Sequence, residues 1–222
     1  MLAKTYYSIT EDLLAQAREN IPKVDFRLTL NEPTGNFFYD SWVIKNEYKD
    51  TVWDLILQTL PFQLGEARII ILEPNSCYTS HGDIDDRWHL NITGERSFVV
   101  DLTSNKMYPQ VADTYWYTMT AGPVHSAVNF NNKPRVQLVV RHLLNRNELE
   151  SPISVKILPN SDRTDLRFQF DQIISPWLNQ ANKRGIISNF VAFETSVSFD
   201  VHGKYVDELL SITPDYFKVE TT

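Results

Sequence analysis

The sequence predicts a mainly β fold, a sandwich or barrel of short strands, with helices before it and a small α+β unit after it. Three observations support this. Strand-length segments separated by turn residues fill the middle of the chain, helical periodicity occurs twice before residue 65, and the pattern changes near residue 145. The 222 residues suffice for one large domain or for a domain with an appendage. We expect a first domain over 1–148 and a second over 149–222.

The N-terminal part mixes helical and strand signals. Ser8 and Glu11 have the spacing of a capping box, and an apolar stripe at helical spacing follows them. Alternation over 24–30 and, more roughly, over 37–43 predicts two strands with a turn between them. A second amphipathic helix is expected over 52–60.

The middle of the chain alternates as half-buried strands do. Its clearest segment begins at Arg87 and puts Arg87, His89 and Asn91 on one face, with Trp88 on the opposite face. The expected strands cover residues 68–72, 87–92, 97–102, 115–120 and 136–143, and His125 opens a further one before the last. Short strands at this spacing are typical of a sandwich or barrel.

The C-terminal third predicts a small α+β unit. A polar stretch over 145–152 is interpreted as a linker. After it we expect a strand over 153–158, a helix starting at Ser175-Pro176, a strand over 190–201, a helix over 206–212 and a last strand over 216–219. Units of this kind often mediate assembly, so the C-terminal unit is our candidate for forming a homo-oligomer.

Composition excludes several classes of function. The formal net charge is −7, from 21 Lys and Arg against 28 Asp and Glu, which disfavours nucleic-acid binding. A single cysteine, Cys77, cannot make an internal disulfide or a cysteine zinc site, and we expect it to be buried. The start MLAKTYYSITED has no apolar core of a signal peptide, and no 18-residue apolar run occurs. We therefore expect no membrane span and a cytoplasmic protein.

The first candidate for chemistry is the pair His81 and Asp83. On an extended segment, a spacing of two puts both side chains on one face, where they can grip one ion. The pair alone is a weak signal, because the run from His81 to Asp86 also resembles an ordinary loop. Asp85 is an alternative acidic ligand.

Two downstream residues strengthen that signal. His125 follows 44 positions after His81, and Arg135 follows ten positions after His125, at the start of an apolar strand. An arginine inside a barrel needs an anionic partner, because an unpaired buried charge is costly. A small dicarboxylate held by the guanidinium fork is a natural partner.

This set of residues resembles the Fe(II)/2-oxoglutarate-dependent dioxygenases. The pattern is His81-x-Asp83, then His125, then Arg135. It is similar in particular to the aspartyl/asparaginyl β-hydroxylase branch, which includes bacterial proline hydroxylases. That branch has an Arg-x-His after the first metal histidine, here Arg87-Trp88-His89, and a His…Asn…Arg motif, here His125…Asn129…Arg135. The resemblance covers about residues 65–145.

The resemblance implies a double-stranded β-helix (a jelly roll, cupin-like) and a role for each matched residue. His81, Asp83 and His125 would bind Fe(II), leaving open positions for 2-oxoglutarate and O2. Arg135 would pair with the distal carboxylate of 2-oxoglutarate, while Arg87 and His89 would steady the cosubstrate near the metal or bind substrate. No match to the family's serine contact for 2-oxoglutarate is visible. The implied reaction is hydroxylation of an unactivated C–H bond of an amino acid, peptidyl residue or similar polar metabolite, with release of succinate.

Weaker expectations concern the substrate. Arg141 shares the face of Arg135 and would suit a substrate carboxylate, and Tyr115 and Tyr117 are candidates for the pocket wall. His142 lies on the opposite face, and we interpret it as structural. Trp88 is interpreted as packing away from the site.

Two other functions stay open. A non-catalytic β-sandwich, a binding or assembly module, would leave these residues in ordinary roles, with Arg87 paired to Asp85 or Asp86 at the surface. A different metal-dependent cupin-like enzyme, such as an isomerase, would use the metal ligands but would not need Arg135.

Overall fold

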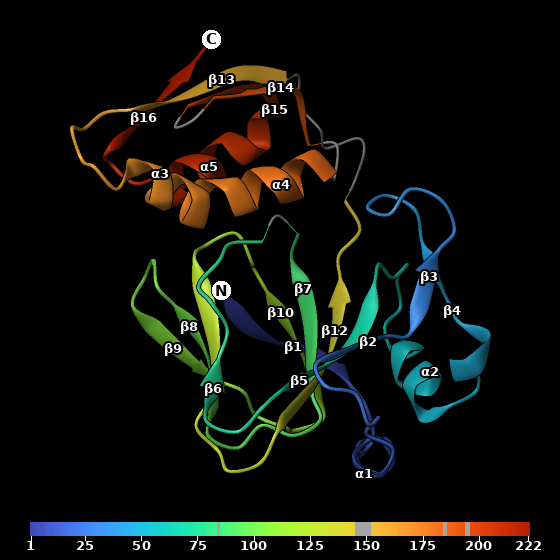
Figure 1. Ribbon diagram of the computed structural model, residues 1–222. Coiled ribbons are helices and arrows are strands. Elements are labelled where there is room, and N and C mark those ends of the chain that lie inside the picture. Colours follow the sequence, from blue (N-terminus) through green and yellow to red (C-terminus); the bar gives the residue numbers. More distant parts are fainter. Residues whose placement is uncertain (84, 145–151, 184–185, 194–195) are drawn as a thin grey trace. The chain divides into compact units, whose positions relative to one another are not determined.

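The computed structural model describes residues 1–83, 85–144, 152–183, 186–193 and 196–222 (Figure 1). The domain boundary expected between 148 and 149, and nearly all of the linker expected over 145–152, lie outside the described residues. The chain divides into two compact units, one built mainly from residues before 145 and one mainly from residues after it. Each unit is described by itself.

The first unit contains two antiparallel sheets. The six-stranded sheet has the order β1 (Leu2–Ser8), β10 (Tyr115–Met119), β7 (Arg87–Asn91), β12 (Arg135–Arg141), β5 (Ala67–Leu72) and β2 (Arg27–Thr29). The four-stranded sheet has the order β6 (Ser76–Cys77), β11 (His125–Asn129), β8 (Ser97–Asp101) and β9 (Lys106–Pro109). Strands β3 (Asn31–Pro33) and β4 (Trp42–Ile44) pair with each other in a separate two-stranded sheet.

The order in which the chain visits the two sheets defines the fold. From β5 to β12, strands β5, β7, β10 and β12 enter the six-stranded sheet, and β6, β8, β9 and β11 enter the four-stranded sheet. This winding is that of a double-stranded β-helix, so the first unit is a jelly roll of the cupin type, as predicted.

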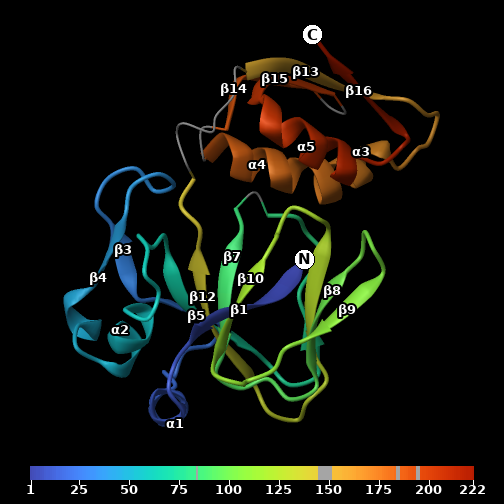
Figure 2. The ribbon, with the colours of Figure 1, turned by 180° about the vertical axis from the view of Figure 1, so that it is seen from behind.

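The apolar core lies on the outer face of the six-stranded sheet. Ile69, Leu138, Leu90 and Trp116 are fully buried and lie in one row across four strands. Helices α1 (Glu11–Glu19) and α2 (Val52–Leu57) lie in the N-terminal part of the chain (Figure 2). The 3-10 turn η1 (Asn46–Tyr48) precedes α2. Their apolar residues join the same cluster. The helices therefore cover the outer face and leave the other face turned into the jelly roll.

Several N-terminal elements differ from the sequence prediction. Ser8 ends strand β1, and Thr10 caps α1 by accepting a hydrogen bond from the backbone N–H of Leu13, so the capping box at Ser8 was wrong. Strand β1 was missed because it lies at a sheet edge with an irregular burial pattern, and it pairs with β10 through a register shift. The strand expected over 24–30 is present only as β2, and the strand expected over 37–43 overlaps β4 only at residues 42 and 43.

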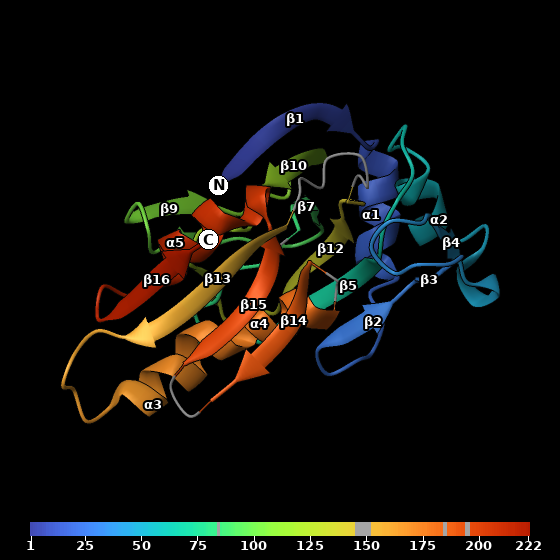
Figure 3. The ribbon, with the colours of Figure 1, turned by 90° about the horizontal axis from the view of Figure 1, so that it is seen from above.

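The second unit is a four-stranded antiparallel sheet with helices (Figure 3). The sheet has the order β14 (Ile187–Ala192), β15 (Val197–His202), β13 (Pro152–Pro159) and β16 (Phe217–Thr221). The helical segments are α3 (Leu166–Gln169), the π-helical turn η3 (Phe170–Ile174), α4 (Ser175–Lys183), the 3-10 turn η4 (Gly203–Tyr205) and α5 (Val206–Ile212).

The α+β content of this unit agrees with the prediction in most elements. The helix beginning at Ser175 and the helix over 206–212 are present. The single strand expected over 190–201 is instead two strands, β14 and β15, and residues 194–195 lie outside the described part. The ring centroids of Trp177 on α4 and Phe199 on β15 lie 6.5 Å apart, so these two side chains pack α4 against β15. Among the described helices, none is long and apolar enough to cross a membrane.

Candidate metal centre and its inner wall

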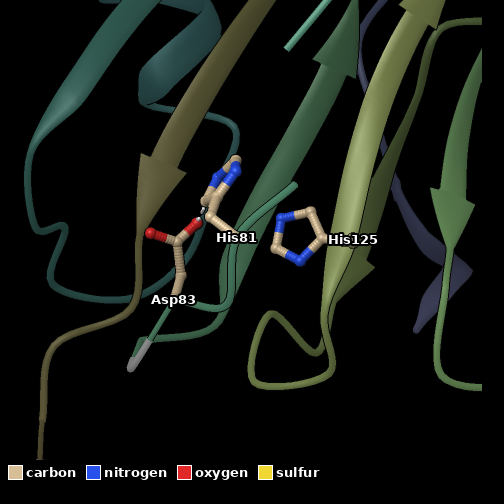
Figure 4. A group of neighbouring side chains, drawn as sticks. All are labelled: His81, Asp83 and His125. Carbon is tan, nitrogen blue, oxygen red and sulfur yellow. Dashed lines mark ion pairs between the residues drawn. The ribbon is translucent and has the colours of Figure 1, made fainter. Parts of the chain in front are cut away.

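His81, Asp83 and His125 come together in the structure (Figure 4). One ligand atom from each lies within 4.8 Å of the other two. His81 Nε2 and Asp83 Oδ2 are 3.5 Å apart, and His125 opens strand β11 with a buried side chain. Two imidazoles and one carboxylate at this separation can hold a divalent cation.

The segment that carries His81 and Asp83 has glycine between them for a steric reason. A Cβ built on Gly82 would lie only 2.7 Å from the carbonyl oxygen of Gly122. Because real Cβ atoms do not approach backbone oxygen so closely, any other residue would force this segment or residue 122 to shift. Gly82 thus fixes the spacing on which the pair of ligands depends.

Asp85, the alternative acidic ligand, has other partners. Its carboxylate accepts hydrogen bonds from Arg87 Nη2 at 2.9 Å and from Arg141 Nη1 at 2.6 Å, and it is buried. Asp83 is therefore the carboxylate that lies beside both histidines. Arg87 is also buried, so the alternative of a surface pair with Asp85 was wrong in its location.

A network of ion pairs continues from Asp85 along the inner face of the six-stranded sheet. The buried Glu66 accepts hydrogen bonds from Arg68 Nη1 at 2.8 Å, from Arg141 Nε at 2.9 Å and from Arg27. Arg141 therefore connects Glu66 to Asp85. Burial, followed by the charges of Arg141 and Arg87, lowers the pKa of Arg27. Sequence reasoning missed Glu66 and Arg68, because they border a short apolar run that shows no clear alternation.

His89 lies in the middle of this inner face. It is paired in register with Tyr117 on one side and Val139 on the other. Neither ring nitrogen has a hydrogen-bond partner among the described residues. Burial, followed by the charges of Arg135 and Arg87, holds the pKa of His89 well below its usual value. The ring is therefore neutral at neutral pH and offers one donor and one acceptor to a bound molecule.

Arg135 begins β12 on the same inner face and is 2% exposed. Its Nε and Nη1 atoms have no hydrogen-bond partner within the described residues. The guanidinium carbon lies 5.8 Å from the ring centroid of Tyr78. Burial lowers the pKa of Arg135, while the neighbouring Tyr78 raises it. The anionic partner expected for this arginine is thus not supplied by the described protein, which leaves room for an anionic ligand.

Asn129 holds the turn that leads into Arg135. Its Nδ2 donates to the carbonyl oxygens of Leu72, Glu73 and Lys133, at 3.0, 3.1 and 2.9 Å. Its Oδ1 accepts hydrogen bonds from the Ser97 hydroxyl and from the backbone N–H of Asn131. Asn129 is fully buried. The asparagine of the His…Asn…Arg motif therefore positions the strand that carries Arg135.

The residues predicted for substrate binding differ in their surroundings. Tyr115 is 36% exposed, and Lys4 Nζ lies 3.6 Å from its ring centroid. Tyr117 is buried and its hydroxyl donates to Asp113 at 2.9 Å. Burial, followed by this carboxylate, raises the pKa of Tyr117 to about 12. Arg141 is engaged in the network described above, so of these three residues Tyr115 is the most accessible.

Residues on the other face of β7 and β12 serve packing. The rings of Trp88 and His142 are stacked, with centroids 4.9 Å apart. Trp88 packs against the outer core cluster. This agrees with the expectation that Trp88 and His142 are structural.

No protein-family model and no curated protein matches this chain. A cupin-superfamily sugar phosphate isomerase from Silicibacter pomeroyi DSS-3 matches with a TM-score of 0.29 and 18% identity, over 44% of this chain and 58% of its own. CapF, in complex with 3-isopropenyl-tropolone, matches with a TM-score of 0.32 and 13% identity, over 62% of this chain and 45% of its own. The matches therefore span about half the length of each of these proteins.

Proposed function

We propose that this protein is an Fe(II)/2-oxoglutarate-dependent oxygenase that hydroxylates an unactivated C–H bond of an amino acid, peptidyl residue or similar polar metabolite. The observation that carries the proposal is the combination of the His81, Asp83 and His125 group with the buried Arg135 of strand β12. A metal group alone would suit many enzymes. A buried guanidinium with unpartnered donors adds the need for an anionic cosubstrate.

The residues fit the metal and the cosubstrate. His81, Asp83 and His125 would hold Fe(II), because two imidazoles and one carboxylate are its usual donors in this class of site. Arg135 would bind the distal carboxylate of 2-oxoglutarate through its guanidinium fork. When bound, the iron and the oxoacid supply the oxidising chemistry, with O2 as oxidant and succinate and CO2 as by-products.

The protein's own contribution is position and shielding. His89 is neutral, so it can donate one hydrogen bond to an oxoacid oxygen without adding charge. Arg87 is held in place by the Asp85 carboxylate, and it can steady the cosubstrate from the same wall. We further propose a cytoplasmic location and a separate C-terminal domain, over 149–222, that mediates homo-oligomer formation.

The decisive experiment is anaerobic addition of Fe(II) and 2-oxoglutarate to the purified protein. We expect the weak visible charge-transfer band of an oxoacid chelated to Fe(II). Without this band in the wild-type protein, the proposal fails. Fe(II) binding without the band would favour a metal-dependent cupin enzyme that uses no oxoacid, and no Fe(II) binding would favour a non-catalytic module.

Variants separate the roles of the residues. His81→Ala should lose Fe(II) binding, measured anaerobically by calorimetry. Arg135→Ala should keep Fe(II) and lose the oxoacid band. His202→Ala, a histidine outside the metal group, is the control and should retain both. If Arg135→Ala binds 2-oxoglutarate as tightly as the wild type, the role given to Arg135 is wrong.

A further inference from the structure

The four-stranded sheet is largely polar on its inner face and apolar on its outer face. Strands β8 and β11 alternate strictly between buried and partly exposed positions. The buried positions turn into the jelly roll and include the polar residues Ser97, Asp101, His125 and Asn129. The opposite positions, with their register partners on β6 and β9, form the outer face: Phe98, Val100, Ser126, Val128, Cys77, Met107 and Pro109.

This distribution is the reverse of the usual one. An antiparallel sheet with one solvated face normally carries polar residues on that face. Here no outward position of the described strands β6, β8, β9 and β11 carries a charge. Large apolar side chains at the margin are exposed: Met107 is 53% exposed, and Phe130, whose ring centroid lies 6.1 Å from that of Phe98, is 51% exposed. Contiguous apolar surface of this kind marks a contact with another molecule.

The described helices of the first unit do not cover this face. Helices α1 and α2 contribute to the core cluster on the outer face of the six-stranded sheet, and none of the outward residues of the four-stranded sheet belongs to that cluster. Figures 1 and 2 show β6, β8 and β9 at the side of the first unit away from α1 and α2. A partner for the face must therefore come from outside the first unit.

A second copy of this chain fits the face in charge and in shape. The chain has a net charge of −7, so two copies repel each other over most of their surfaces, but the face brings no charge to a contact. A charged partner would find no countercharge there. Sheets twist with one hand, and two of them pack face to face at about −30° and about 10 Å apart, so the face is complementary to a sheet of its own twist.

We infer that the outer face of the four-stranded sheet is the interface of a homodimer, in which two copies of this chain pack face to face across a two-fold axis. Such an axis puts the same patch on both partners, as a self-complementary neutral face requires. The interface lies in the first unit and is distinct from the contact that we propose for the C-terminal domain. It does not depend on the oxygenase activity.

The test measures association of the full chain, without added metal or 2-oxoglutarate, by sedimentation velocity over about 1–100 μM. We expect a reversible equilibrium between monomer and dimer. Cys77 supplies a second measurement, because it is the single cysteine of the chain and lies exposed on this face. Its labelling by a maleimide should slow at least about tenfold as the dimer forms.

The double variant Val100→Lys with Val128→Lys should weaken dimerisation at least about 100-fold, because ammonium groups would be buried without partners. The matched control is Val43→Lys with Leu55→Lys, at exposed apolar positions on β4 and α2, and it should dimerise as the wild type does. Both double variants change the net charge from −7 to −5, which reduces the general repulsion between copies.

A milder variant guards against misfolding. Met107→Lys changes a side chain that is already exposed, and it should weaken dimerisation at least about tenfold while the thermal unfolding temperature stays that of the wild type. Thermal unfolding of the two double variants shows that each is folded, and Met107→Lys decides the test if Val100→Lys with Val128→Lys does not fold.

Each other outcome overturns the inference. A wild-type protein that stays monomeric, equal losses in the two double variants, or a dimer with unchanged labelling of Cys77 would each do so. Association lost only in Phe190→Lys with Val191→Lys, at exposed positions of β14, would place the contact in the second unit instead. Because neither metal nor 2-oxoglutarate is present, failure here leaves the oxygenase proposal standing, and failure of the oxoacid band leaves this result standing.

Discussion

Arg135→Met should stabilise the protein in the absence of ligands while abolishing binding of 2-oxoglutarate. Arg135 carries two buried nitrogens without hydrogen-bond partners among the described residues, and each costs about 1–3 kcal/mol. Methionine fills a similar volume without polar atoms. Against this gain stands the lost contact with Tyr78, worth about 0.5–2 kcal/mol. The net increase in the free energy of unfolding is on the order of 2 kcal/mol.

The assay is urea unfolding of the metal-free protein, followed by tryptophan fluorescence. Arg68→Met is the matched control, since Arg68 lies on the same inner face but donates to Glu66 at 2.8 Å. We expect Arg68→Met to lower the free energy of unfolding by about 1–3 kcal/mol. In parallel, Arg135→Met should weaken 2-oxoglutarate binding by at least about 100-fold, because a bidentate charged pair is lost. If Arg135→Met is no more stable than the wild type, the guanidinium is satisfied by the protein and the reasoning fails.

Three further predictions concern the inner wall and its supports. Asn129→Ala should lower the free energy of unfolding by about 2–4 kcal/mol in urea, since it leaves several carbonyl groups of the turn without a donor; an unchanged midpoint would contradict this role. Asp85→Asn should cost about 3–5 kcal/mol because the buried Arg87 and the partly buried Arg141 lose their carboxylate, and Asp165→Asn, in an exposed pair, should cost far less by the same measurement. The pKa of Tyr117 is raised to about 12 from 10.0, so the unfolded state releases this proton first as the pH rises. The contribution of Tyr117 to stability should thus be complete below pH 10 and be lost as the pH rises toward about 12, and Tyr117→Phe should remove one late-ionising tyrosine from the ultraviolet titration.

The fold class, and the proximity of His81, Asp83 and His125, could be predicted where local patterns were strict. Arg87 to Asn91 alternates without exception, and this gave the correct inner and outer faces of β7. His81 and Asp83 come together with His125 because the connections of a jelly roll bring distant strand ends together, and the resemblance supplied that topology.

The remaining features depend on tertiary contacts that no local pattern records. Glu66 precedes the apolar strand β5, and Arg68 lies within it. The charge of Glu66 is explained by Arg27 of β2 and Arg141 of β12, and the charge of Arg68 by Glu66 itself. Cys77 was expected to be buried and is exposed, because β6 is a two-residue edge strand that covers little.

In the six-stranded sheet, the residues that stabilise the fold and the polar residues that face the interior lie on opposite faces. Its outer face supplies the hydrophobic stabilisation through α1 and α2, and its inner face contributes polar side chains such as His89, Gln137 and Arg141. Substitutions at inward-facing positions of this sheet therefore do not change the residues of the main apolar core. A combinatorial library restricted to inward positions outside the ion pairs of Glu66 and Asp85 should yield mostly folded variants, so that this scaffold can change the molecules it accepts faster than it loses its structure.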